Sequence, residues 1–260
     1  MELFTVGGCV RDEILGIKSK DIDYSVVLSP DEIVPRRAKS GKMIEQTPFE
    51  IMENELRRRG FRIYQKKPEY LTIRAKFPNY NYADPAVIRL GPSGLDADFV
   101  LARKEGSYSD GRRPDAVEVG TLQDDLARRD FTMNAIAKDV DGNLIDPFGG
   151  QEDIRKGLIR CVGKPFDRIL KEDPLRGLRA MRFSVTKGFE IDNDILLVLK
   201  SRHFKDEIVK TTKAERVREE LEKMFAANTL DTVMLLTELG LIGTLFNNQT
   251  GIRLMPTMKG

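Results

Sequence analysis

The most informative stretch of the sequence begins Leu3-Phe4-Thr5-Val6-Gly7-Gly8-Cys9-Val10-Arg11-Asp12 and resumes, after a short linker, with Asp21-Ile22-Asp23-Tyr24-Ser25-Val26-Val27-Leu28. Apolar and β-branched residues up to Val6 predict a strand, and the helical spacing of apolar residues over 10–15 predicts a short helix. The glycines between them let the backbone approach a ligand, and N–H groups at a helix start favour an anion such as phosphate. Gly7, Gly8 and Arg11 are therefore candidate phosphate ligands.

Two carboxylates lie on the second strand of this stretch. Because side chains alternate along a strand, Asp21 and Asp23 face one side of the sheet, while Ile22 and Tyr24 face the other. An all-oxygen pair of this kind suits Mg²⁺ held together with substrate phosphates. Alone, a Gly-Gly turn is usually only a turn and an Asp-x-Asp is usually a solvated strand end. Their adjacency predicts one metal-nucleotide site.

A third strand, predicted over 95–102, also carries acidic residues on one face. Asp96 and Asp98 share that face, whereas Leu95, Ala97 and Phe99 share the other. Either aspartate could bring a third carboxylate to the site.

Charge and composition narrow the function classes. The 260 residues include 43 basic and 41 acidic side chains, so the net charge of +2 gives no global field toward nucleic acid or membrane. The basic run over 57–62 is typical of a solvated helix face, the pair Arg112 and Arg113 is another local cluster, and only the cluster over 155–187 looks functional.

Few side chains are available for histidine or thiol chemistry. His203 is the only histidine, which nearly excludes histidine-based acid-base or nucleophile-base schemes. Cys9 and Cys161 lack metal-type spacing, which favours structural roles in a reduced compartment. The N-terminus has no apolar targeting run, and no apolar segment approaches membrane-spanning length, so we expect a cytoplasmic protein without membrane contact.

Several further elements can be assigned from local signals. Thr47, Pro48 and Glu50 form a capping-box pattern that predicts a helix to Arg59, and Thr212 with Glu215 predicts a second box that opens a helix through residue 227. The ranges 61–64 and 71–77 predict a hairpin. The range 103–114 predicts an irregular loop, either a surface linker or a working flap.

The range 121–137 predicts one continuous helix. On it Asp130 and Asn134 lie one turn apart, next to Arg129, so a cation, an acceptor and an amide come together. This grouping is either a helical salt-bridge cluster or a ligand site.

The sequence Asp146-Pro147-Phe148-Gly149-Gly150 predicts a hinge or boundary between domains at 1–150 and 151–260. Beyond it helical periods dominate. Arg176, Arg179 and Arg182 repeat at three-residue spacing on one side of a predicted helix, opposite Leu175, Leu178 and Met181. Such a row is usually a solvated face, and it also suits a polyanion.

Five motifs in order resemble those of one family, the class II tRNA nucleotidyltransferases (CCA-adding enzymes) and bacterial poly(A) polymerases. They are Gly7-Gly8-Cys9-Val10-Arg11-Asp12 with Asp21-Ile22-Asp23, Arg128-Arg129-Asp130-Phe131-Thr132-Met133-Asn134-Ala135, Asp146-Pro147-Phe148-Gly149-Gly150, Glu172-Asp173-Pro174-Leu175-Arg176, and Ala214-Glu215-Arg216-Val217-Arg218-Glu219-Glu220-Leu221. The resemblance spans Leu3 to about Leu221. It implies an α+β fold: a polymerase-β-like nucleotidyltransferase head with a mixed, five-stranded sheet, followed by an all-helical neck and a truncated body.

The resemblance also implies roles for residues of the head. Asp21 and Asp23 are expected to hold two Mg²⁺ ions for an in-line displacement, with Asp98 as the third catalytic carboxylate and Asp96 as the fallback. Gly7, Gly8 and Arg11 are expected to bind the triphosphate. The ribose is expected to contact Arg129, Asp130 and Asn134.

In the neck, Asp173 and Arg176 are expected to select the nucleobase, with Glu172 and Arg179 in support and 215–218 bracing the neck. An acceptor beside a fork of donors resembles a Watson-Crick edge, which cytosine and adenine can pair with. Uracil and guanine present a carbonyl and a ring N–H instead, so an acceptor would face the Asp173 carboxylate and a donor would face Arg176. A good bidentate contact discriminates by about 1–3 kcal/mol.

The implied activity is addition of C and A to the 3′ end of tRNA from CTP and ATP, with release of pyrophosphate and without a template. Poly(A) addition, or partial addition of CC or A, uses the same residues. An inactive RNA-binding relic is a third possibility, which the intact carboxylates oppose. No obligate protein partner is inferred. The chain ends soon after the neck and is long between 29 and 95, so the grip on full tRNA is the least supported expectation.

Overall fold

The structure is a computed structural model and describes residues 1–19, 21–34, 36–37, 43–79, 87, 89–105 and 117–246. The basic pair at 112–113, the predicted loop from 106 to 114 and the tail from 247 lie outside these residues. The chain divides into two compact units. The first comprises Met1–Glu105, Val117–Arg129 and Met133–Gln151, and the second comprises Asp130–Thr132 and the described residues from Glu152 onward.

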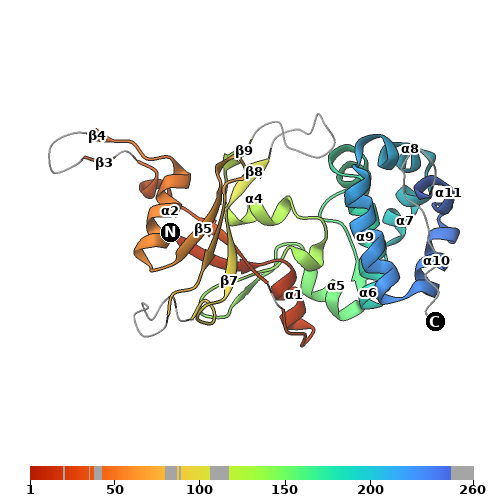
Figure 1. Cartoon of the computed structure of the whole chain (residues 1–260), viewed down its shortest axis with the longest axis horizontal. Coiled ribbons are helices and arrows are strands. Elements are labelled where there is room, and N and C mark those ends of the chain that lie inside the picture. The colour runs from red at the N-terminus through yellow and green to blue at the C-terminus, as the bar shows by residue number, and fades with distance from the viewer. Residues whose placement is uncertain are drawn as a thin grey trace. The chain divides into compact units, whose positions relative to one another are not determined.

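A mixed sheet forms the centre of the first unit (Figure 1), and its strands follow the order β11-β10-β1-β2-β7-β6-β5. The strands are β1 (Glu2–Val6), β2 (Ile22–Val27), β5 (Arg62–Lys67), β6 (Thr72–Lys76), β7 (Asp96–Leu101), β10 (Ala137–Lys138) and β11 (Leu144–Ile145). Only the central pair, β2 and β7, is parallel. The sheet has seven strands rather than the expected five, because the two-residue strands β10 and β11 extend it beyond β1.

The remaining elements of the first unit connect and cover these strands. They are α1 (Gly8–Ile14), η1 (Pro30–Glu32), β3 (Arg36–Arg37), β4 (Met43–Ile44), α2 (Pro48–Arg58), η2 (Pro68–Tyr70), β8 (Arg103–Glu105), β9 (Val117–Val119), α4 (Leu122–Ala127) and η4, a 3₁₀ turn over Thr132–Asn134 that begins in the second unit. The predicted hairpin is β5–β6, and β8 occupies the first residues of the predicted loop.

One face of the sheet holds the apolar core. Tyr24 and Phe99 stack with ring centroids 5.0 Å apart, and both are fully buried together with Ile73. Helix α2 covers this face (Figure 1) with Met52 and Leu56, which are also fully buried. Each such side chain contributes about 1.5–3 kcal/mol through burial. Because side chains alternate along a strand, Asp23 and Asp98 must point to the opposite face.

The predicted helix over 121–137 is wrong beyond residue 127. Helix α4 ends at Ala127, and Phe131 then forms a β-bridge with Cys161. The backbone N–H of Thr132 donates to the carbonyl of Arg160 at 2.9 Å, and the N–H of Val162 donates to the carbonyl of Asp130 at 3.1 Å. Non-local pairing therefore satisfies the backbone groups that a longer helix would have used.

Helices dominate the second unit, apart from one short parallel pair, β12 (Leu158–Ile159) and β13 (Glu190–Ile191). The helices are α5 (Gly150–Lys156), which begins in the first unit, η5 (Phe166–Glu172), a π-helix, α6 (Leu175–Lys187), α7 (Asn193–Lys200), α8 (Arg202–Thr211), α9 (Ala214–Ala227), α10 (Thr229–Glu238) and α11 (Ile242–Leu245). No helix in the described part of the chain is long and apolar enough to cross a membrane.

Helix α6 is closely packed along its apolar side. Leu175, Leu178 and Met181 are buried, as their spacing predicts. Gly177 has no space for a side chain, because a Cβ atom there would lie 2.6 Å from the Phe204 ring and 2.7 Å from Leu199. Only glycine allows the helix to approach these two residues so closely.

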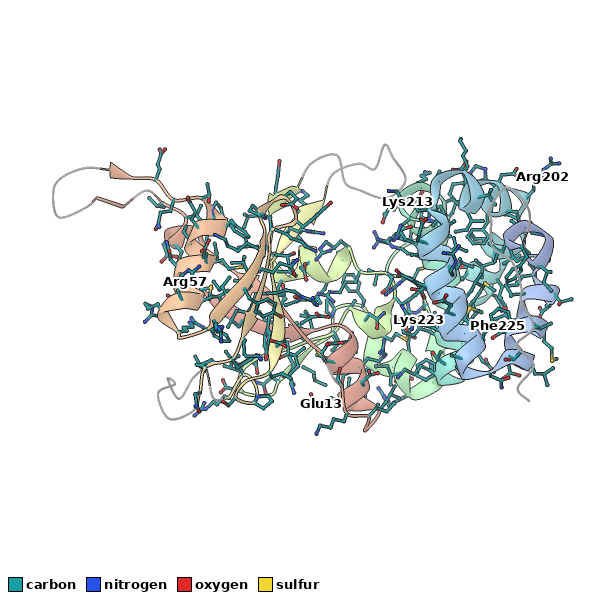
Figure 2. The ribbon with its side chains drawn as sticks, in the orientation of Figure 1. Glu13, Arg57, Arg202, Lys213, Lys223 and Phe225 are labelled. Atoms are coloured by element: carbon teal, nitrogen blue, oxygen red, sulfur yellow. The ribbon has the colours of Figure 1, made fainter. Side chains whose placement is uncertain are left out.

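The two predicted capping boxes have different outcomes. Thr47 caps α2: its side chain accepts from the N–H of Glu50 at 3.2 Å, and the Glu50 carboxylate accepts from the N–H of Thr47 at 2.8 Å. The helix predicted after Thr212 is present as α9, but its N-cap is Lys213 (labelled in Figure 2), so the box is wrong. Thr212 lies one residue too early for the side-chain-to-N3 spacing that a box requires.

Candidate active site

The carboxylates at the start of the second strand meet those of the third across the parallel pair. Asp23 of β2 is in register with Asp98 of β7, and Asp21 lies two residues before Asp23. Asp96 is directed to a cation instead, with Lys76 Nζ 3.9 Å from its Oδ1. Of the two aspartates on β7, Asp98 is therefore the direct neighbour of Asp23.

Electrostatics shows that these carboxylates are close enough to repel one another. Burial raises the pKa of Asp23 above its ordinary value, the charge of Arg129 lowers it, and the charges of Asp98 and Asp21 raise it further. The net shift is upward and follows mainly from burial, with the two neighbouring carboxylates adding to it; such a combination is typical of a site that handles a cation or a proton.

Arg74, which the sequence did not single out, faces Asp98 across the antiparallel pair β6–β7. Its Nε and Nη2 donate to the two carboxylate oxygens at 2.5 and 3.0 Å. This bidentate ion pair partly neutralises Asp98. Only the cross-strand register identifies it, and that register is not visible in the sequence.

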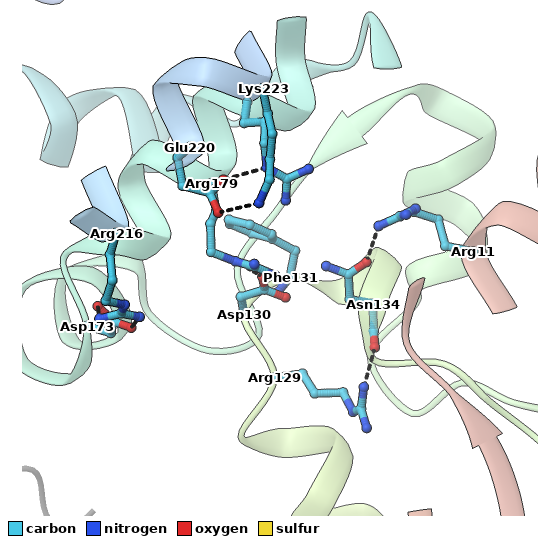
Figure 3. A network of polar contacts seen from close by, with 11 residues as sticks. Arg11, Arg129, Asp130, Phe131, Asn134, Asp173, Arg179, Arg216, Glu220 and Lys223 are labelled. Atoms are coloured by element: carbon cyan, nitrogen blue, oxygen red, sulfur yellow. Dashed lines mark hydrogen bonds and ion pairs between the residues drawn. The ribbon is translucent and has the colours of Figure 1, made fainter. Parts of the chain in front are cut away.

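The glycine turn before α1 is shaped by an arginine. Gly7 has φ +80, and a Cβ atom there would lie 2.7 Å from Arg129 Nη1. Arg11 is buried, and its Nη1 donates to Asn134 Oδ1 at 2.6 Å (Figure 3). Arg129 Nη1 donates to the Asn134 carbonyl at 3.5 Å. Gly7, Arg11, Arg129 and Asn134 thus come together within the first unit.

Asp125 holds Arg129 in place, and sequence reasoning missed it. This fully buried carboxylate accepts from Arg129 Nη2 at 3.0 Å and from Arg128 Nη2 at 2.6 Å. Burial alone would raise the pKa of Asp125, but the charges of Arg128 and Arg129 bring it below its ordinary value. Asp125 precedes Arg128 by three residues and Arg129 by four, and this spacing in the sequence could have predicted the ion pairs.

Asp130 does not share a helical face with Asn134, because the segment between them is not an α-helix. Within the second unit its carboxylate accepts from Arg179 Nε and Nη2 at 2.8 and 2.5 Å (Figure 3). The charge of Asp130 raises the pKa of Arg179 above its ordinary value. The expected helical face that carries both Asp130 and Asn134 is therefore wrong, while Asn134 contacts both Arg129 and Arg11.

The pair expected to select the base is held by other residues of the second unit. Asp173 ends η5 in an extended conformation, and its Oδ2 accepts from Arg216 Nη2 of α9 at 2.8 Å. Arg176 Nη1 donates to Glu172 at 2.5 Å, and Glu172 also accepts from Arg168 Nη1 at 2.5 Å. Asp173 and Arg176 are connected through the backbone, where the Arg176 N–H donates to the Asp173 carbonyl at 3.0 Å.

The arginine row on α6 is matched by carboxylates rather than left to solvent. Arg176 contacts Glu172, Arg179 contacts Asp130, and Arg182 Nε donates to Glu220 at 2.5 Å. The row predicted from the sequence is therefore a set of ion pairs within the second unit.

Among the described residues, no group of three or more His, Cys, Asp or Glu side chains is arranged to hold a metal ion. The chemistry of Asp21 and Asp23 nevertheless fits Mg²⁺, since both are carboxylates on one strand face and Asp98 is in register beside them. Mg²⁺ commonly takes one or two protein carboxylates and completes its shell with water and substrate phosphates.

A cavity of about 760 Å³ lies on the first unit. Its lining includes Cys9, Lys18, Ile22 and Lys138, and none of the predicted site residues contributes to it. Ile22 alternates with Asp23 on β2, so the cavity and the carboxylates use opposite faces of that strand.

The family model described as the Poly A polymerase head domain matches residues 3–160. The chain belongs to this family. A relative in it, a CCA-adding enzyme of Geobacillus thermodenitrificans, is 34% identical over 242 residues, which cover 92% of this chain and 50% of the relative.

Two solved structures agree with this membership of the Poly A polymerase head domain family. The Bacillus stearothermophilus CCA-adding enzyme in complex with CTP is similar with a TM-score of 0.68 and 28% identity, covering 94% of this chain and 49% of that one. A tRNA nucleotidyltransferase complexed with a primer tRNA and an incoming ATP analog has a TM-score of 0.66 and 26% identity, covering 94% and 59%. The chain thus spans about half the length of these relatives.

Proposed function

We propose that this chain is a template-independent RNA nucleotidyltransferase that adds C and A to tRNA 3′ ends from CTP and ATP. The observation that carries the proposal is that Asp23, two residues after Asp21, is in register with Asp98. The glycine turn at Gly7, next to Arg129, lies beside these carboxylates. Residues 1–150 are proposed as the catalytic head and 151–260 as the helical neck with a partial body. The proposal covers catalysis and base choice, and the cytoplasmic location stays a prediction.

Asp21 and Asp23 are the proposed ligands of two Mg²⁺ ions, which when bound supply activation of the RNA 3′ hydroxyl and stabilisation of the pyrophosphate leaving group. Asp98 adds negative charge beside them and exchanges its partner Arg74 for solvent or cation as the site fills. Its ion pair with Arg74 keeps the carboxylate oriented until then.

The triphosphate is proposed to bind at Gly7, Gly8 and Arg11. Gly8 is open on one side, since a Cβ atom there would meet only Arg11, at 3.5 Å. Arg129 and Asn134 are proposed to hold the ribose. Asp130 is proposed to join them through an acceptor position of its carboxylate that Arg179 leaves open, since both bonds from Arg179 go to Oδ2.

Base choice is proposed to rest on Asp173 and Arg176. An incoming cytosine or adenine would offer its amino group to Asp173 and its ring nitrogen to Arg176, replacing the contacts with Arg216 and Glu172. When no nucleotide is bound, Arg176 pairs again with Glu172 and Asp173 pairs again with Arg216.

Incubation of the protein with Mg²⁺, a tRNA that ends before CCA, and labelled nucleotides, singly and together, tests the function. Ordered addition of two C and one A supports the proposal. A long A tail supports poly(A) addition, which uses the same residues, and the absence of any addition by freshly folded protein contradicts both.

Two variants test the residue assignments. Asp23→Ala should abolish addition without unfolding the chain, while Asp31→Ala, at an exposed position on η1, should not; addition by Asp23→Ala at the wild-type rate would remove the metal assignment. Asp173→Ala should relax the choice of CTP over UTP by about 5- to 150-fold, the equivalent of a lost bidentate contact. Unchanged selectivity would contradict the pairing argument.

A further inference from the structure

The pairing of β5 with β6 contains an irregularity that changes which side chains share a face. Ile63 pairs with Ala75 and packs against the core on the α2 side. Lys66 pairs with Ile73, and its Nζ lies 3.2 Å from Glu53 of α2, on that same side. In a regular strand, residues three apart face opposite ways. One extra residue between them, a β-bulge, allows both to face α2.

The bulge directs Tyr64 to the face of the sheet that carries the catalytic carboxylates. Gln65 pairs with Arg74, so Tyr64 is the residue without a partner in the register. Its side chain is 54% exposed. Partial burial and the charge of Asp96 raise the pKa of Tyr64, the charge of Arg74 lowers it, and the charge of Asp98 and a hydrogen bond with Asp96 raise it further. The phenol therefore lies beside Asp96 of β7.

Cations accompany this exposed ring. Arg74 and Lys76 lie two residues apart on β6 and therefore share the face of Tyr64. Arg74 pairs with Asp98, and Lys76 is 3.9 Å from Asp96 with its side chain 46% exposed. An accessible aromatic ring next to basic side chains is the arrangement by which proteins bind single-stranded nucleic acid, through base stacking and phosphate attraction.

We propose that Tyr64 and Lys76 form a platform for the 3′-terminal nucleotides of the RNA substrate, with a base stacked on Tyr64 and a phosphate at Lys76. The inference rests on the proposed function, which requires an RNA end beside Asp98. It assigns this task to the β5–β6 hairpin, which lies in the chain between β2 and β7, the two strands that carry the carboxylates.

Fluorescence tests stacking without reference to catalysis. The chain has no tryptophan, so Tyr64→Trp introduces a single reporter. Addition of a short single-stranded RNA should quench its emission, whereas Tyr70→Trp, placed on η2 at the end of the hairpin, should change little. An unquenched Tyr64→Trp reporter at RNA concentrations that saturate binding overturns the proposal.

Kinetics provide the second test. Tyr64→Ala should raise the KM for the RNA on the order of ten-fold, more than it lowers kcat, and Tyr64→Phe should restore it because the ring is kept. Lys76→Ala should also raise this KM. Lys66→Ala is the matched control: Lys66 has the same 46% side-chain exposure but contacts α2 on the opposite face.

The outcomes separate the two proposals. If the wild-type protein adds no nucleotide, the proposed function fails. If it is active but Lys66→Ala and Lys76→Ala have equal effects, or Tyr64→Ala raises only the KM for the nucleotide, then the RNA platform alone is wrong. Thermal unfolding of each variant shows whether the fold is kept.

Discussion

Gly7 has a backbone conformation and a neighbour that together exclude other residues. Its φ of +80 and ψ of −135 lie in a region that side chains with a Cβ avoid, at a cost of about 1–3 kcal/mol. A Cβ atom would also lie 2.7 Å from Arg129 Nη1. We expect Gly7→Ala to lower the free energy of unfolding and, by displacing Arg129, to raise the KM for nucleotides about ten-fold. Urea denaturation and steady-state kinetics measure both effects.

Gly16→Ala is the control for backbone strain alone. Gly16 also has positive φ, +71, but nothing lies within 4 Å of the position where its Cβ would be. It should lose stability by about 1 kcal/mol without a change in the nucleotide KM. Equal effects of the two substitutions on this KM would show that crowding of Arg129 is unimportant.

At the level of single residues, the sequence predicted those side chains whose position depends on strand alternation. The shared face of Asp21 and Asp23, and of Asp96 and Asp98, follows from the two-residue period alone. The partner Arg74 could not be predicted, because it depends on which residue of β6 lies opposite Asp98. Glu172 was expected to support Asp173 and Arg176, and its spacing of four residues from Arg176 is a local signal for their ion pair. The contact of Arg216 with Asp173 could not be predicted, because it joins residues 43 apart in sequence.

Helix α2 is stabilised by pH-dependent ion pairs of Glu55. Glu55 accepts hydrogen bonds from Arg58 and Arg59. The bonds from Arg58 lower its pKa most, burial opposes them by raising it, and the bond from Arg59 with the charges of both arginines brings it to about 2. Because this pKa is lower in the folded chain, the stabilisation is complete above about pH 4.5 and is lost as the pH falls toward 2.

We expect Glu55→Gln to reduce the free energy of unfolding by about 1 kcal/mol at pH 7, a value kept small because Arg58 is largely exposed to solvent. The difference from wild type should disappear near pH 2. Urea denaturation across this pH range measures it, with Glu69→Gln at an exposed site as the control. A difference that persists unchanged at pH 2 would contradict the role of the charge.

Elements were predicted well where local signals agreed with the tertiary structure and badly where they did not. The Gly-Gly turn, α2 with its cap, and the strands β2 and β7 were confirmed. The helix over 121–137 was wrong because its second half has helical periodicity but uses its backbone to pair with 160–162. The bulge at Tyr64 gave no signal, because an extra residue in a strand becomes visible only through its partner.

The chain passes between its two units more than once. It leaves the first unit after Arg129, returns at Met133, and leaves again after Gln151. The glycine-containing segment 146–150 predicts only one boundary. It cannot show that Asp130–Thr132 belongs to the second unit, because that depends on backbone hydrogen bonds to 160–162. The units are therefore expected to unfold together.

One buried thiol in each unit tests this expectation. Burial raises the pKa of Cys9, and it raises that of Cys161 to about 12, so neither should react with a thiol reagent at pH 8 in the native protein. In increasing urea, both should become reactive with the same midpoint, as followed by mass spectrometry of the labelled peptides. Separate midpoints would show that the units unfold independently.

Gly177 links nucleotide choice to helix packing. It follows Arg176 directly, and any side chain there would press on Phe204 and Leu199 and move the first turn of α6. On the proposed assignment, substrate preference can therefore drift through mutations that never touch a nucleotide. Leu199→Ala, which opens space behind Gly177, offers such a path, and a changed ratio of CTP to UTP incorporation would reveal it. The specificity of this chain would then be encoded partly in its hydrophobic core.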